Sequence, residues 1–134
     1  MARIPLGRTI AERTYQLHTP AGVRLVTVRI GQPVPDPKPG GDWLCPVAFR
    51  GAPRGRLPSG THAVYGVDAL QAMVLGVGYA QQTLAQLQHQ SGGKLTWLGS
   101  ADLGLPDIIR LVGVRRLFRS PSRLRLVERR PPAS

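Results

Sequence analysis

The residue best suited to covalent chemistry is Cys45, the single cysteine of the 134-residue chain, which stands in the run Trp43-Leu44-Cys45-Pro46. A cysteine becomes a nucleophile when a cation, a histidine or a helix N-terminus lowers the pKa of its thiol. Cys45 instead shares one face of a predicted strand with Trp43 and Val47, where a small buried hydrophobic residue is expected. We therefore interpret Trp43 and Cys45 as structural residues.

Acid–base and metal chemistry have few candidates. The histidines His18, His62 and His89 fall in a turn, before a short strand and late on a polar helix, and this spacing matches no common metal site. The seven acidic residues suggest no pair of carboxylates of the kind that cleaves glycosidic bonds. The chain is therefore predicted not to be an enzyme and to have no catalytic residue, metal or cofactor.

Asp68 and Gln71 allow two interpretations. Asp68 can accept a backbone N–H bond at a helix start, and Gln71 can bond back to the Asp68 N–H group, which together form a capping box. Alternatively, both side chains point into a pocket at the helix N-terminus, where exposed N–H groups attract an anion. The cap already uses both side chains, so the structural interpretation is favoured.

The charge of the chain is strongly positive. The chain contains eighteen Lys and Arg and seven Asp and Glu, which gives a formal net charge of +11 at pH 7. Eight arginines follow residue 109, and this part contains one acidic residue, Glu128, so it alone carries a charge of +7. The arginine preference of a GC-rich genome would explain the general basicity equally well. The residues predicted to bind a partner or nucleic acid are Arg110, Arg115, Arg116, Arg119, Arg123 and Arg125.

These arginines lead to two functional hypotheses. In the first, the chain is a partner-binding protein, for example of the immunity or accessory type, whose arginines meet an acidic protein surface. In the alternative, the chain is a nucleic-acid-associated protein that binds phosphates. Base stacking needs exposed aromatic side chains, and Phe118 is the only one from residue 110 onward. The sequence makes no prediction of the oligomeric state.

The first two-thirds of the chain predicts strands separated by turns. Thr9–Leu17 and Val23–Gly31 form an expected antiparallel hairpin, with Val26, Val28 and Ile30 on one face. The Pro- and Gly-rich stretches 32–41 and 51–60 are predicted to be loops. Further predicted strands are Trp43–Phe49, His62–Tyr65 and Lys94–Leu98.

A long helix is predicted from Ala69 to about Gln90, ending at Ser91-Gly92-Gly93. Its predicted apolar stripe consists of Leu70, Met73, Val74, Val77, Leu84 and Leu87. Two glycines inside it, Gly76 and Gly78, indicate that another stretch of backbone packs closely there. The predicted fold is α+β: an antiparallel sheet of four to five strands with one long helix packed across one face.

The C-terminal part is expected to complete one domain and then form a tail. Residues 105–110 could begin a short helix with Pro106 at its first position, and Leu111–Phe118 fits either a strand or a helix. Residues 1–118 are predicted to form a single domain, with a basic, partly disordered tail over 119–134. No run of about 18 apolar residues suggests a membrane span, and no signal-peptide core is visible, so a cytoplasmic location is expected.

Three motifs resemble those of a family of small bacterial domains of unknown function. They are Trp43-x-Cys45 in a strand, Gly66-x-Asp68-x-x-Gln71-Ala72 at a helix start, and Asp102-Leu103-Gly104-x-Pro106 after Trp97-Leu98-Gly99. The resemblance covers about residues 10–106, and Leu105 stands where an aromatic residue would be usual. It implies an α+β domain without an assigned activity. By analogy, small proteins of this kind often bind one partner.

Overall fold

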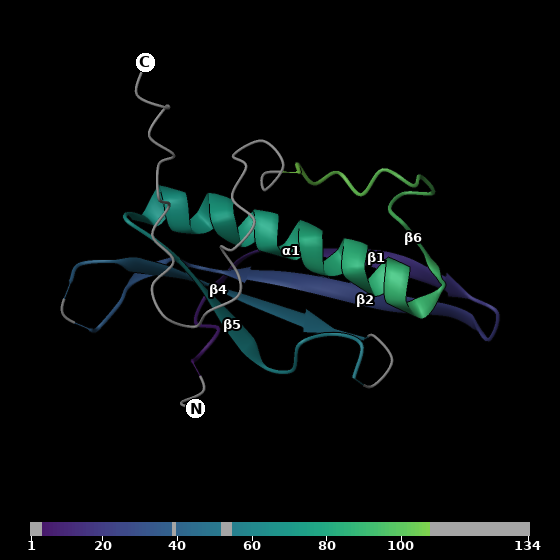
Figure 1. The fold of residues 1–134 in the computed structure, drawn as a ribbon, viewed down its shortest axis with the longest axis horizontal. Helices are drawn as coiled ribbons and strands as arrows, with labels where there is room; N and C mark the ends of the chain where they lie inside the picture. Colours follow the sequence, from purple (N-terminus) through teal and green to yellow (C-terminus); the bar gives the residue numbers. More distant parts are fainter. Residues whose placement is uncertain (1–3, 39, 52–54, 108–134) are drawn as a thin grey trace, which may run out of the picture.

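An antiparallel sheet with one long helix packed against it forms the body of the molecule (Figure 1). The computed structural model describes residues 4–38, 40–51 and 55–107. In chain order the elements are β1 (Thr9–Thr19), β2 (Gly22–Gly31), β3 (Val34–Pro35), β4 (Trp43–Arg50), β5 (Thr61–Gly66), α1 (Ala69–Ser91) and β6 (Lys94–Thr96). The predicted α+β class is confirmed. Within the described residues the sheet has six strands, because the two-residue strand β3 forms inside the predicted loop 32–41.

Strand β4 lies inside the sheet and pairs with three other strands. The order is β3-β4-β2-β1-β6, and β5 pairs with β4 along the edge opposite to β2 and β3. β2 pairs with the second half of β4, from Val47 to Arg50, whereas β3 pairs with Trp43 and Leu44. Pro46 lies between these two pairings, where a residue without an N–H group disturbs the sheet least.

The predicted β1–β2 hairpin is confirmed. The two strands pair antiparallel from Thr19 and Gly22 at the turn to Thr9 and Gly31 at the far end. Side chains alternate between the two faces of each strand. Those of Val26, Val28 and Ile30 are buried on one face, as predicted.

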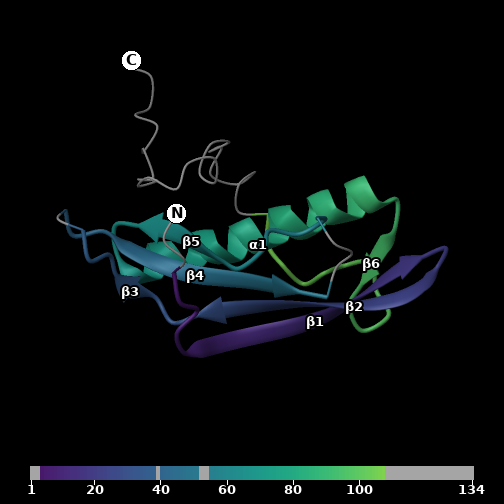
Figure 2. The ribbon, with the colours of Figure 1, turned by 90° about the horizontal axis from the view of Figure 1, so that it is seen from below.

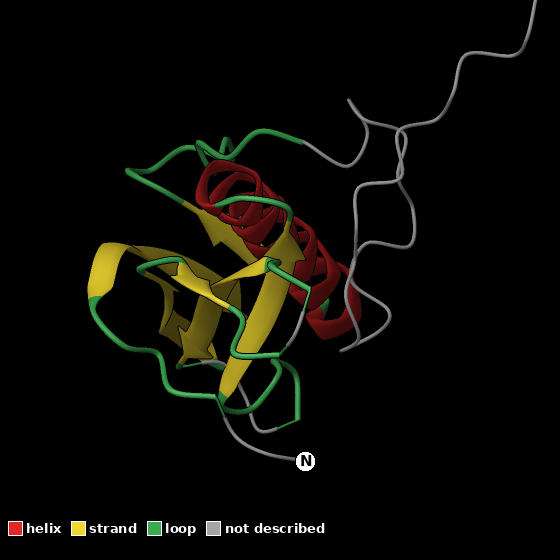
Figure 3. Ribbon diagram, turned by 90° about the vertical axis from the view of Figure 1, so that its left-hand side faces the viewer, coloured by secondary structure: helices red, strands yellow, loops and turns green. Residues whose placement is uncertain are grey.

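The helix covers one face of the sheet, so that helix and sheet form two layers (Figure 3). α1 packs mainly against β4 and β5 and runs along the sheet (Figure 2). Cys45 and Val47 of β4 point to this face and are fully buried, as the predicted alternation requires. The core therefore lies between β4, β5 and the helix and extends to the inner face of β1 and β2.

The helix begins at the predicted cap. The N–H group of Gln71 donates to Oδ1 of Asp68 over 2.8 Å. The side chain of Gln71 bonds back, but its Oε1 accepts from the N–H group of Val67 over 2.7 Å, one residue before the one predicted. Gly92 ends the helix in the left-handed region, with φ at 65°.

The side that the helix buries differs from the predicted stripe. Leu84 and Leu87 are buried as expected, but Leu70 and Val74 are 65% and 40% exposed. The sheet is covered instead by Ala72, Leu75, Gly76, Tyr79, Ala80 and Thr83, together with Leu84 and Leu87. The stripe was wrong in its first half because the first turns are apolar on nearly all sides, so residue spacing does not decide which side is buried.

Gly76 allows the helix to approach β4 closely. A side-chain carbon at this position would lie 2.9 Å from Sγ of Cys45 and 3.4 Å from a methyl group of Val47. The expectation that another backbone packs against Gly76 is therefore wrong. A neighbouring side chain fills the space, and a small residue on the helix is required to leave room for it.

The chain after β6 is extended and irregular as far as residue 107. The part of the predicted helix 105–110 that is described, residues 105–107, is not helical. Residues 108–134, which contain the predicted segment Leu111–Phe118 and the predicted tail, lie outside the described residues. In the part of the chain that the structure describes, no helix is long and apolar enough to cross a membrane.

Candidate functional site

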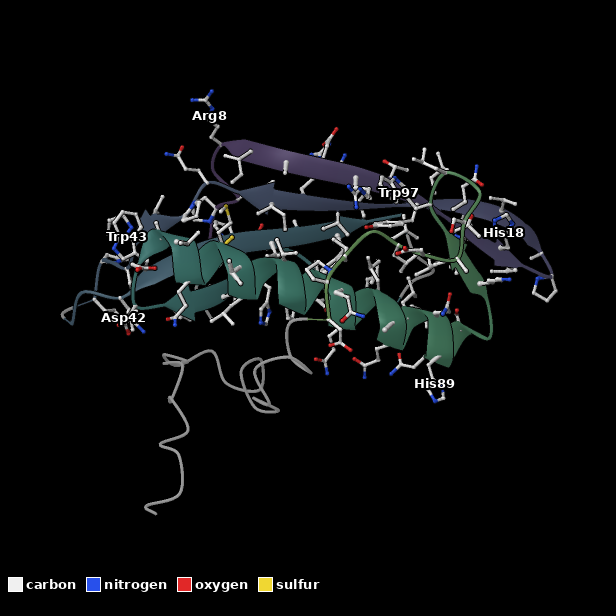
Figure 4. All side chains as sticks on the ribbon, turned by 90° about the horizontal axis from the view of Figure 1, so that it is seen from above. Arg8, His18, Asp42, Trp43, His89 and Trp97 are labelled. Carbon is white, nitrogen blue, oxygen red and sulfur yellow. The ribbon has the colours of Figure 1, made fainter. Side chains whose placement is uncertain are left out.

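Trp43 and Cys45 occupy structural positions in β4. The Cys45 thiol is fully buried and donates to the carbonyl oxygen of Gly31, with 3.7 Å between sulfur and oxygen. Burial raises the pKa of the thiol to about 12, so the reactive thiolate is disfavoured. Trp43 is half-buried and packs on the core near the start of α1 (Figure 4). Both positions favour the structural interpretation.

We expect Cys45 to react with iodoacetamide at least about 100-fold more slowly in the native chain than in the unfolded chain, because labelling requires local opening of the core. Mass spectrometry after incubation with and without urea measures this ratio. Native labelling at the unfolded rate would contradict the burial of this thiol.

The helix-start motif also has a structural role. Asp68 and Gln71 lie together and each bonds to backbone N–H, which favours the capping interpretation over an anion pocket. Gly66 lies against the first turn of α1, and a side-chain carbon there would collide with the backbone of Ala72. The residues of this motif therefore set the junction between β5 and the helix.

The six predicted partner-binding arginines all lie outside the described residues, so the structure does not bring them together. The described residues contain eight Lys and Arg against six Asp and Glu, a net charge of +2. The strong basicity of the chain therefore belongs to sequence beyond this part. Among the described residues, no three His, Cys, Asp or Glu side chains are grouped as metal ligands would be.

A row of apolar side chains extends along the exposed side of the helix start. It consists of Val67, Leu70, Met73, Val74 and Val77, and we name it the α1 flank. Val67, Leu70 and Val74 are exposed, while Met73 and Val77 are half-buried. The spacing of three and four residues places Leu70, Met73, Val74 and Val77 on one side of α1, and Val67 lies just before the helix. This surface was missed because its four helical residues were assigned to the apolar stripe that faces the sheet.

The segment after β6 folds over the inner face of β1. Trp97 and Ser100 exchange backbone hydrogen bonds of 2.8 and 2.9 Å across a tight turn. Oδ1 of Asp102 then accepts from the N–H group of Gly104 over 2.9 Å. Gly104 has φ at 66° and lies against the Trp97 ring, which leaves no room for a side chain. The last family motif therefore builds this loop.

Arg13 fastens the loop to the sheet. Its guanidinium carbon lies 3.7 Å from the centroid of a Trp97 ring, and its Nη1 donates to the carbonyl oxygens of Leu103 and Gly104 over 3.2 and 3.1 Å. The Tyr15 hydroxyl donates to the same Leu103 oxygen over 3.1 Å. Burial raises the pKa of Tyr15, an effect that Arg13 opposes, and the hydroxyl keeps its proton. Figure 4 shows Trp97 beside β1, far from Trp43.

Sequence reasoning missed Arg13. The available signal was its position on β1. Arg13 stands two residues before Tyr15 and four before Leu17, so it shares the inner face with these buried residues. A charged residue on the inner face of a strand requires a polar or aromatic partner. Its partners lie about ninety residues away along the chain, and no local pattern reveals them.

The loop, the sheet and the helix line a pocket of about 210 Å³ that is partly open to solvent. The helix contributes Val77 and Ala80, and the loop contributes Gly104, Leu105 and Pro106. The strands β1 and β2 contribute Ala11, Glu12, Arg13, Tyr15, Val28 and Ile30. The lining is therefore mostly apolar, with Arg13 as its one inward-facing charged residue among the described residues.

The fold and this set of structural motifs define a small α+β domain in which one capped helix covers an antiparallel sheet. Residues 11–107 match the model of the family described as Domain of unknown function (DUF6968), and the chain belongs to this family. The match includes all three motifs, from Trp43 to Pro106, in agreement with the predicted resemblance. No curated protein and no solved structure matches the chain.

Proposed function

We propose that this domain is a partner-binding protein of the immunity or accessory type, which acts in the cytoplasm without catalysing a reaction. The observation that carries this proposal is the α1 flank, which exposes Val67, Leu70 and Val74 side by side. Contiguous exposed apolar side chains are unfavourable in water and commonly mark a site of protein association.

The flank has the features of an interface centre. Apolar anchors provide most of the binding free energy when a partner removes them from water. Leu70 alone, at 65% exposure, would contribute about 1 to 2 kcal/mol on complete burial. The helix beneath the flank is capped at its start, so little conformational entropy is lost on binding.

The charge of the whole chain favours an acidic partner. The arginines after residue 109 give that part a charge of +7, and a positive field speeds the encounter with an acidic surface. The structural roles of the motif residues support a function that involves no catalysis. Cys45 fills the core, Asp68 and Gln71 cap the helix, and Asp102 shapes a loop.

The test compares proteins that co-purify with the tagged full chain from its source cells, with the variants Leu70→Asp and Leu25→Asp beside it. Aspartate in the first helical turn is compatible with the helix dipole, so Leu70→Asp is expected to remain folded. Leu25 is 60% exposed and lies on the sheet face opposite the helix, which makes it a matched control. We expect a specific protein to be lost with Leu70→Asp and retained with Leu25→Asp.

Nuclease treatment separates this proposal from the nucleic-acid alternative. A protein partner held by the flank remains bound after digestion, whereas proteins bridged by nucleic acid are released. Binding to phosphates would also weaken steeply with salt. Retention of every partner by Leu70→Asp together with release by nuclease would replace the proposal with the alternative.

A further inference from the structure

We propose that the pocket between α1, the β1–β2 hairpin and the loop 104–106 binds a small carboxylate with a compact apolar body, and that Arg13 holds the carboxylate. Ligand binding here does not depend on the partner-binding role proposed above, although Val77 of the α1 flank also lines the pocket. The volume of the pocket, its apolar walls and the hydrogen bonding of the Arg13 guanidinium support the proposal.

The volume suits a molecule of the size of one ring. An engineered apolar protein cavity of about 150 Å³ binds benzene. The pocket here measures about 210 Å³, which leaves room for a ring or a branched chain with one polar group. A nucleotide is much larger than this space, so most of it would have to remain outside the pocket.

The walls select an apolar body. Val28 and Ile30 of β2 line it, as do Val77 and Ala80 of α1. Leu105 and Pro106 of the loop complete the apolar lining. Apolar walls of this kind stabilise a hydrocarbon group by removing it from water.

Arg13 provides the charge that selects an anion. Glu12 is paired with Arg29, and in the part of the chain that the structure describes no ion pair is seen between Arg13 and a carboxylate. Its hydrogen bonds to Leu103 and Gly104 both use Nη1, and the Tyr15 hydroxyl also interacts with the guanidinium, so at most the N–H groups of Nε and Nη2 remain for a ligand. A guanidinium edge of this kind can bind a carboxylate through two parallel hydrogen bonds.

The guanidinium is also held in position before any ligand binds. Trp97 stacks against it at 3.7 Å, and the two loop carbonyls fix its orientation. A preorganised group loses little entropy on binding, which favours affinity. Glu12 also lines the pocket, but its carboxylate is paired with Arg29 at 3.1 Å, which reduces its repulsion of an anion.

The experiment titrates the full chain with benzoate and with benzyl alcohol, a neutral molecule with the same ring, and follows the amide resonances of the lining residues by NMR. We expect benzoate to shift these resonances with a dissociation constant in the millimolar range, as the size of the ligand allows. Arg13→Met keeps the length of the side chain and removes the charge. It is expected to weaken benzoate binding at least about tenfold and to leave benzyl alcohol binding within about twofold.

Two further variants complete the test. Arg24→Met removes a charge from an exposed position of β2 and is expected to leave benzoate binding unchanged. Because Arg13 also fastens the loop, Val77→Phe provides a variant that fills the pocket without removing those bonds, and it is expected to abolish the binding of both ligands. The Tm of each variant reports whether it is folded.

Three results would overturn the proposal. One is the absence of shifts at the lining residues with benzoate at ten times the expected dissociation constant. Another is an equal loss of benzoate affinity in Arg13→Met and in Arg24→Met, which would indicate a general effect of the net charge. The third is unchanged benzoate binding in folded Val77→Phe, which would place the bound molecule elsewhere.

Discussion

Replacement of Gly66 by alanine is expected to destabilise the domain by about 3 kcal/mol or more, since overpacking against a rigid backbone has no inexpensive relaxation. The new carbon would lie 2.8 Å from Cα of Ala72 and 2.9 Å from the carbonyl carbon of Gln71. These atoms belong to the first turn of α1, so either β5 or the helix must move. Urea denaturation followed by circular dichroism measures the loss of free energy of unfolding.

Gly41→Ala is the control for this variant. Gly41 has φ at 73° and no atom within 4 Å of the added carbon, so the substitution introduces backbone strain without a collision. We expect a cost of about 1 kcal/mol from that strain. If Gly66→Ala were no more destabilising than Gly41→Ala, the close contact between β5 and the helix start would be wrong.

A pair of leucine-to-alanine substitutions on one helix tests which side faces the sheet. Leu84 is 0% exposed and Leu70 is 65% exposed, although both belonged to the predicted stripe. Leu84→Ala is expected to cost about 3 to 5 kcal/mol, because it leaves a cavity in the core. Leu70→Ala is expected to cost less than about 0.5 kcal/mol, as is usual for an exposed position. Thermal and urea unfolding of both variants measure the difference.

Equal destabilisation by the two variants would contradict the observed orientation of α1. The same pair is informative about function. Leu70→Ala leaves the fold intact and removes an apolar anchor of the α1 flank, so the proposed partner should bind it more weakly than the native chain. Leu84→Ala should affect the partner only through the population of folded protein.

The strands were predictable because their alternation is local. Val26, Val28 and Ile30 mark the inner face of β2 by their spacing alone, and Trp43, Cys45 and Val47 do the same for β4. The two-residue strand β3 was missed, since Val34 and Pro35 lie among prolines and pair only because β4 passes beside them. The residues around Val34 therefore do not reveal that β4 will pair with this segment.

The helix was predictable in extent and not in orientation. Its start follows from Asp68 and Gln71, whose side chains interact with nearby backbone. The buried side follows from the fit against β4, where small residues such as Ala72 and Gly76 allow close packing. A hydrophobic stripe favours large apolar residues, and so it directed the prediction to Leu70 and Val74.

The candidate site was predictable only where one residue type stood out. The arginines after residue 109 were identified from charge, and their role remains a proposal. Arg13 and Trp97 are more than eighty residues apart, and their contact depends on the path of the chain after β6. Contacts between residues so far apart in the sequence can be identified only from the folded structure.

The contact between Cys45 and Gly76 makes these two positions share one fixed volume. A larger residue at 76 is tolerated only if residue 45 becomes smaller, whereas glycine at 76 cannot shrink to admit a larger residue at 45. A side chain at 76 should therefore occur among related sequences only together with a smaller residue at 45. A serine at 45 would keep the size and place a hydroxyl where the thiol now meets the Gly31 oxygen. A valine at 45 would instead force the helix away from β4 and loosen the whole layer above it.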